Sequence, residues 1–252
     1  MKNRNTSTIG WLLASLLTAT VTAQAALYDL NAGWSDSNNP NGVWTYREGT
    51  NALPHQASLT PANFSSAQPA WARTDGSSSG DHTFLPLWFK LSATPLFALD
   101  MQTGDVGMHS TDSTNGIGAG PGNVIWTSPT NGTASIAGAV WEARDIGRSN
   151  HWSLSINGVV VTGGDISAAN SSRSVPFDFS AGSGGAAALA NIPVFAGEVI
   201  ALQIAETSVN TFGDLVGTRF TVNTVPEPST AFFSVIGVLG LALRRIRNGR
   251  NG

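Results

Sequence analysis

Residues 142–152 (E-A-R-D-I-G-R-S-N-H-W) hold the densest group of side chains in the sequence that could do chemistry. Paired carboxylates are the usual machinery of glycosidases. Neighbouring arginines, however, favour ionised carboxylates, whereas a general acid needs a raised pKa. The first interpretation is therefore a set of structural ion pairs at a strand end. The second is hydrogen bonding to sugar hydroxyls by Arg144, Asp145, Arg148 and Asn150, and catalysis is the third.

Tryptophans offer a second kind of sugar contact, because exposed indole faces can stack on sugar rings. Seven of the eight tryptophans lie beyond residue 25. Trp126 and Trp152 fall in strand-like patterns and are predicted to be in the core. Trp34, Trp44 and Trp71 lie in polar, loop-like surroundings. They are candidate binding platforms, and the alternative is that they cap the core.

Metal and nucleophile chemistry has little support in the sequence. There is no cysteine, so thiol nucleophiles and cysteine-ligated metals are excluded. The four histidines are isolated, and the G-x-S-x-G match at 76–80 sits in a Ser/Gly loop without the strand and helix of a nucleophile elbow. We expect no cofactor, apart from a candidate structural calcium on the Asp/Asn-rich segments 36–39 and 100–112. The alternative for those segments is solvated acidic loops.

The elements that position these residues are predicted to be strands. The 252 residues include 28 Gly and 12 Pro, and only 12% are charged. Apolar residues alternate with polar ones over 152–156 and 200–205, and Asn157-Gly158 marks a hairpin turn. We therefore expect an all-β fold, an antiparallel two-sheet jelly-roll-like sandwich over 26–225. Residues 26–225 carry seven basic and fifteen acidic side chains, which makes nucleic acid an improbable partner.

The first 25 residues are typical of a secretory signal peptide. Lys2 and Arg4 precede an apolar run over 9–21, too short for an ordinary membrane span. Ala23 and Ala25 form an A-x-A cleavage site. We therefore expect a signal helix over 1–25, partners in the general secretion machinery and signal peptidase, and a mature chain that begins near Ala26.

The last 27 residues have a different organisation. Pro226, Glu227 and Pro228 precede an apolar run that predicts a short membrane helix over 230–243. This run is short for a hydrocarbon core of about 30 Å. It is followed by arginines that would stop transfer on the cytoplasmic side, namely Arg244, Arg245, Arg247 and Arg250.

This ending resembles the PEP-CTERM sorting signal of Gram-negative bacteria, which combines a motif like V-P-E-P-S-T with an apolar helix and an arginine cluster. The resemblance covers residues 226–252. It implies that an exosortase-type membrane protease recognises Pro-Glu-Pro and removes the tail. The protein would then be anchored transiently in the inner membrane by its C-terminal helix before it reaches the cell surface or extracellular matrix.

A looser resemblance covers most of 36–224. Its elements are 39–46, 121–129, 145–150, Asn157-Gly158 and 194–200 with the later Gly213-Asp214. They are similar in layout to galactose-binding-like and carbohydrate-binding jelly-roll modules. The resemblance implies fold more than function. The expected function is a non-enzymatic, exported, exosortase-processed surface or matrix protein that binds exopolysaccharide. The alternatives are an extracellular glycan hydrolase or lyase, and a purely structural surface protein without a ligand.

Overall fold

Two antiparallel β-sheets make up the body of the protein in the computed structural model, which describes residues 24–60, 66–74, 82–92, 99–112, 120–207 and 212–227. In these ranges the larger sheet has nine strands, and its main path runs β12-β9-β15-β7-β6-β5-β4. β1 pairs with β15 and β13 pairs with β9. The bounds are β1 Ala26–Asp29, β4 His55–Leu59, β5 Gln68–Ala72, β6 Leu87–Lys90, β7 Val106–His109, β9 Gly132–Glu142, β12 Phe177–Asp178, β13 Ile192–Val194 and β15 Leu215–Pro226.

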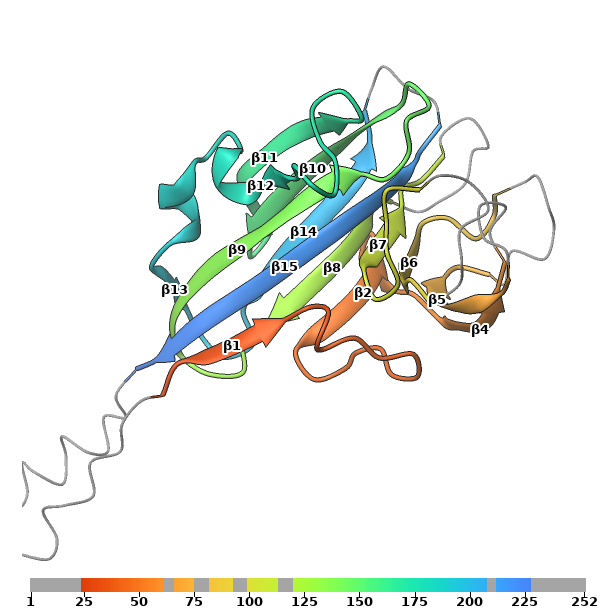
Figure 1. The fold of residues 1–252 in the computed structure, drawn as a ribbon. Helices are drawn as coiled ribbons and strands as arrows, with labels where there is room; N and C mark the ends of the chain where they lie inside the picture. Colours follow the sequence, from red (N-terminus) through yellow and green to blue (C-terminus); the bar gives the residue numbers. More distant parts are fainter. Residues whose placement is uncertain are drawn as a thin grey trace, which may run out of the picture. The chain divides into compact units, whose positions relative to one another are not determined.

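The smaller sheet runs β11-β10-β14-β8-β2-β3 in the described part of the chain. Its strands are β2 Trp44–Glu48, β3 Asn51–Ala52, β8 Gly122–Thr127, β10 Ser149–Ile156, β11 Val159–Ser167 and β14 Val199–Glu206. The two sheets face each other in a β-sandwich-like arrangement, with β9 and β15 in front of β10, β14 and β8 in Figure 1. Two short 3-10 turns, η2 Phe179–Ala181 and η3 Ala186–Leu189, follow β12.

The predicted hairpin is confirmed, because Ser149–Ile156 and Val159–Ser167 pair antiparallel around Asn157-Gly158. Both turn residues have positive φ, 50° and 83°, as a two-residue turn of this hand requires. The alternation over 200–205 is also confirmed, since Ile200, Leu202 and Ile204 are buried along β14. The all-β class therefore follows from the two-residue period of the sequence.

The main core lies between the sheets. The predicted core residues Trp126 and Trp152 are both completely buried there. Phe179 and Phe220 meet edge-on with ring centroids 6.0 Å apart. A second apolar cluster, which includes Leu59, Leu85, Phe89 and Leu215, packs around the β4–β7 end of the larger sheet. The two clusters together give the body its hydrophobic stabilisation.

Residues 26–224 form one compact unit. Its two ends are neighbours, because Ala26 pairs with Thr224 and Asp29 with Thr221. β15 continues two residues past the last pair, to Pro226, the first residue of the Pro-Glu-Pro motif.

The expected helices at the two ends of the chain, over 1–25 and 230–243, lie outside the described residues except for positions 24 and 25. Within the described ranges, no helix has the length and apolar character that crossing a membrane requires.

Candidate functional site

A buried polar network joins the two sheets at the end where the 142–152 cluster lies. The Asn150 amide of β10 donates to both carboxylate oxygens of Glu142, which ends β9, at 3.0 and 3.1 Å. The side-chain oxygen of Asn150, Oδ1, accepts from the Ser110 hydroxyl at 2.6 Å. The Ser110 Oγ in turn accepts from the backbone N–H of Asp214 at 3.0 Å. Three side chains and the backbone N–H of Asp214 thus tie together the ends of β7, β9, β10 and β15.

Two arginines border this network. Arg144 Nη1 lies 3.4 Å from Asp214 Oδ1. Arg148 Nη1 donates to the Gly213 carbonyl at 2.6 Å, and its guanidinium lies over the Phe212 ring, 5.0 Å from the centroid. The sequence therefore correctly predicted structural pairing here, but it missed the partner Asp214, which lies 70 residues from Arg144. The nearby Gly213-Asp214 pattern was the available signal.

Burial, rather than the arginines, controls the charge of the network. Glu142 is 2% exposed, and burial raises its pKa to about 9, against the opposing effects of Asn150 and the arginines. Burial likewise raises the pKa of Asp214, whose Oδ2 has no hydrogen-bond partner among the described residues. Arg144 and Arg148 do favour the ionised form of Glu142, as the sequence predicts, but loss of solvent has the larger and opposite effect on its pKa.

His109 completes the buried group. Its Nδ1 lies 2.9 Å from the Ser110 carbonyl oxygen, so this nitrogen carries the proton. Burial lowers the pKa of His109 to about 4, and the nearby Arg144 and Arg148 add to the effect. The imidazole is therefore neutral at physiological pH.

This arrangement does not resemble an open acid–base site. Both oxygens of Glu142 are occupied by Asn150, and Asn150 itself has no exposed surface. A glycosidase needs its two carboxylates to flank a bound sugar. The chemistry that this network performs is to hold four strand ends together, since buried polar groups are costly unless they are paired.

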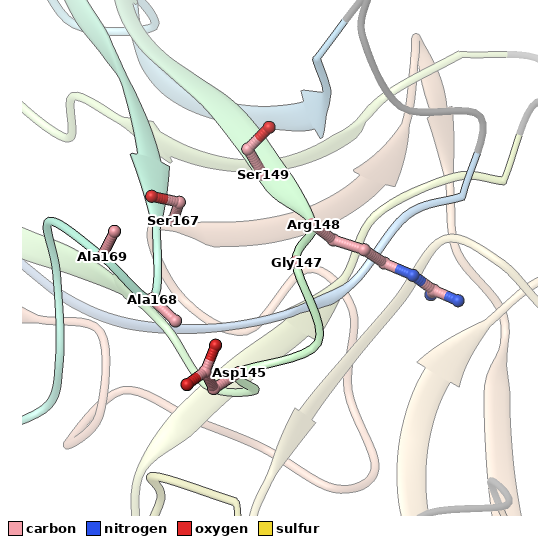
Figure 2. Close-up of a pocket in the computed structure, with 7 residues that line it drawn as sticks. All are labelled: Asp145, Gly147, Arg148, Ser149, Ser167, Ala168 and Ala169. Carbon is pink, nitrogen blue, oxygen red and sulfur yellow. The ribbon is translucent and has the colours of Figure 1, made fainter.

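An open pocket of about 380 Å³ lies beside the network and is lined by Asp145, Gly147, Arg148, Ser149, Ser167, Ala168 and Ala169. Figure 2 shows the Arg148 side chain extending away from Asp145 and Ser167. Of the four predicted sugar-binding residues here, Asp145 alone is exposed without a partner in the described part of the chain. Arg144 and Arg148 bind Asp214 and Gly213, and Asn150 is buried against Glu142.

The structure corrects the prediction that three tryptophans are candidate binding platforms. Trp44 and Trp71 are 2% and 3% exposed, so neither offers a ring face to a ligand. Their polar sequence surroundings were misleading, because Trp44 heads the buried strand β2 and the Trp71 indole donates to the Ser35 carbonyl at 2.9 Å. Trp34 is half-buried against Tyr46, with ring centroids 4.7 Å apart. All three close the core, which was the alternative interpretation.

The acidic segments considered for calcium are engaged internally. Asp36 accepts from the Trp34 indole at 2.6 Å, and Asp105 forms an ion pair with Arg173 at 2.6 Å. Asp112 lies 3.7 Å from His82. No group of three His, Asp or Glu side chains that could hold a metal occurs within the described ranges.

The sorting residues lie at the edge of the described chain. Pro226 ends β15 and Glu227 follows it, whereas Pro228, Ala23, Arg244, Arg245 and Arg247 lie outside the described residues. Ala25 is exposed, one residue before β1. Comparison with protein-family models, curated proteins and solved structures gave no match for this chain.

Proposed function

We propose that this chain is a non-enzymatic, exported protein that an exosortase-type protease processes for the cell surface or extracellular matrix. Signal peptidase and the secretion machinery act on residues 1–25, and the protease acts on the Pro226-Glu227-Pro228 motif of a PEP-CTERM tail. The short apolar segment over 230–243 holds the chain in the inner membrane until that cut. The body is a jelly-roll-like module that contacts exopolysaccharide.

One observation carries this proposal. The compact unit begins at Ala26 and ends at Thr224, and these two residues are paired neighbours. The suggested cuts therefore fall outside the paired residues of the body, although Pro226 of the sorting motif is still the last residue of β15. A precursor trimmed at both ends retains the whole core between the sheets.

The closed site supports a role other than catalysis. The most strongly perturbed acid, Glu142, is buried and accepts from the Asn150 amide on both carboxyl oxygens, which suits a structural network better than proton transfer to a substrate. A glycan hydrolase or lyase is thus the less supported alternative. The body carries an acidic balance, so association with a polymer would rely on individual sites rather than on a basic surface.

Replacing Pro226, Glu227 and Pro228 together by alanine is expected to leave the uncut precursor in the membrane fraction of the producing cell. The protease would lose its recognition sequence, while the apolar segment and the arginines remain. Cell fractionation with mass determination of the exported chain measures this. Asn223→Ala, an exposed change just upstream, is the matched control and should be processed normally. Normal release of the triple variant would refute the proposed sorting.

A further inference from the structure

A second pocket, of about 500 Å³, lies on the larger sheet where β1 runs beside β15 (Figure 1). Its wall includes Asp29 at the end of β1, Asn31 in the following loop, Asp105, and Arg219 and Thr221 on β15. The volume is within the roughly 300 to 1,000 Å³ of small-ligand sites. The β1–β15 register fixes part of this wall, because Asp29 and Thr221 are directly opposite each other.

Arg219 is the unusual member of the wall. Its guanidinium lies over the Trp141 ring, 5.3 Å from the centroid, and the side chain is exposed. Within the described residues it forms no hydrogen bond and no ion pair. Trp141 is fixed in turn, being fully buried with its indole N–H on the Asp100 carbonyl at 2.7 Å. A planar group with its N–H donors free is therefore held on a rigid support, ready to bind a carboxylate.

The possible acceptors in this pocket differ in whether their oxygen atoms already have hydrogen-bond partners. Asp105 binds Arg173 through both oxygens, at 2.6 and 3.1 Å, so it does not neutralise Arg219. Asp29 accepts from the Ala32 N–H through Oδ1 at 2.8 Å, which leaves Oδ2 without a partner in the described part of the chain. Thr221 donates its hydroxyl to the Ala137 carbonyl at 3.2 Å and keeps acceptor capacity.

The open groups that line this pocket therefore comprise one guanidinium, one carboxylate oxygen and one hydroxyl oxygen. Lys90 adds positive charge nearby, because its Nζ donates to the Asn31 carbonyl at 3.0 Å. A neutral sugar would leave the guanidinium without an ionic partner. A ligand with both a carboxylate and hydroxyl groups matches the two kinds of contact together.

We propose that this pocket binds a carboxylate-bearing sugar unit of an acidic polysaccharide. The sugar carboxylate pairs with Arg219, and its hydroxyls donate to Asp29 and Thr221. This deepens the proposed function, since it names the class of polysaccharide that an exported chain would meet. Binding by one exposed ion pair is weak and falls with added salt, so retention on a polymer comes from many copies acting together.

The test is a titration of the full-length chain, kept in mild detergent, with an oligogalacturonate. Calorimetry measures the affinity, and NMR spectra record the arginine side-chain signals. The Arg219 signal should shift, and Arg219→Gln should weaken binding by about three- to fivefold, as expected for one exposed ion pair. The fully methyl-esterified oligomer should bind equally weakly to both proteins. Glu198→Gln, in the turn between β13 and β14 and not part of this pocket's wall, is the control and should bind like the unchanged chain.

Unchanged affinity in Arg219→Gln, or equal affinity for the charged and esterified oligomers, would overturn the proposal. Acetate that binds as tightly as the oligomer would show a simple anion site and would also overturn it. If Arg219→Gln fails to fold, Thr221→Val and Asp29→Asn remain, and each should weaken binding severalfold. Because binding is measured on the purified chain, its failure is distinguishable from a failure of Pro-Glu-Pro processing in cells.

Discussion

Replacing Trp44 by alanine is expected to lower the free energy of unfolding by about 3 to 5 kcal/mol, the usual loss when a large aromatic side chain is removed from a core. Trp44 is 2% exposed and meets the Phe220 ring edge-on, with centroids 5.2 Å apart. Its indole also packs directly on Gly33, because a Cβ atom added to Gly33 would lie only 2.5 Å from the Cδ1 atom of Trp44.

Urea denaturation of the full chain, followed by tryptophan fluorescence and far-UV circular dichroism, measures this loss. Trp34→Ala is the matched control, because Trp34 is half-buried and its removal should cost clearly less. The interpretation of Trp44 as an exposed binding platform predicts instead that Trp44→Ala leaves the fold intact. A Trp44→Ala variant as stable as the unchanged chain would support that earlier prediction and contradict the structure.

The second large effect concerns pH and Glu142. Its pKa is about 9 in the folded protein and 4.5 ordinarily, so between these values the folded state holds a proton that the unfolded chain has released. The free energy of unfolding therefore falls as pH rises, by at most about 1.4 kcal/mol per pH unit. Glu142→Gln keeps a neutral side chain of similar shape and should remove this decline between pH 7 and 9.

His109 has the opposite effect on the pH dependence of the free energy of unfolding, and it acts at acidic pH. Its pKa falls from 6.5 to about 4 on folding, so the unfolded chain takes up a proton first and stability decreases as pH drops through this range. Between about pH 4.5 and 6.5 the effects of Glu142 and His109 on the free energy of unfolding oppose each other. Above pH 6.5 the loss of stability caused by Glu142 is the larger of the two effects.

Urea midpoints of Glu142→Gln and the unchanged chain at pH 6, 7, 8 and 9 provide the measurement. Glu198→Gln, in the turn between β13 and β14, is the control and should keep the alkaline decline. Equal loss of stability in Glu142→Gln and the unchanged chain between pH 7 and 9 would show that Glu142 is not the group responsible.

Much of the fold was predictable because strand periodicity is local. The hairpin at Asn157-Gly158 and the alternation of Ile200, Leu202 and Ile204 both needed only a few adjacent residues. The pairing order was less accessible. β15 pairs with β1 and β7, and nothing in the sequence near Leu215–Pro226 specifies those partners.

The site was less predictable for the same reason. The four predicted sugar-binding residues are close in sequence, yet their side chains do not share one site. Arg144 pairs with Asp214, Arg148 bonds Gly213 and Asn150 bonds Glu142. The partners that define the network, Ser110 and Asp214, are 104 residues apart. Burial decides both the charge of Glu142 and the role of Trp44, and burial depends on contacts that only the assembled sheets provide.

The pairing of Ala26 with Thr224 also makes the body suitable for circular permutation. Opposed Cα atoms in antiparallel strands are about 4.5 to 5.5 Å apart, so a linker of a few glycines could join these two residues. New ends could then be opened at the Asn157-Gly158 turn, where side chains on both sides are exposed or half-buried. Such a rearranged chain would keep its strand ladders, because the covalent break would have moved from one surface turn to another.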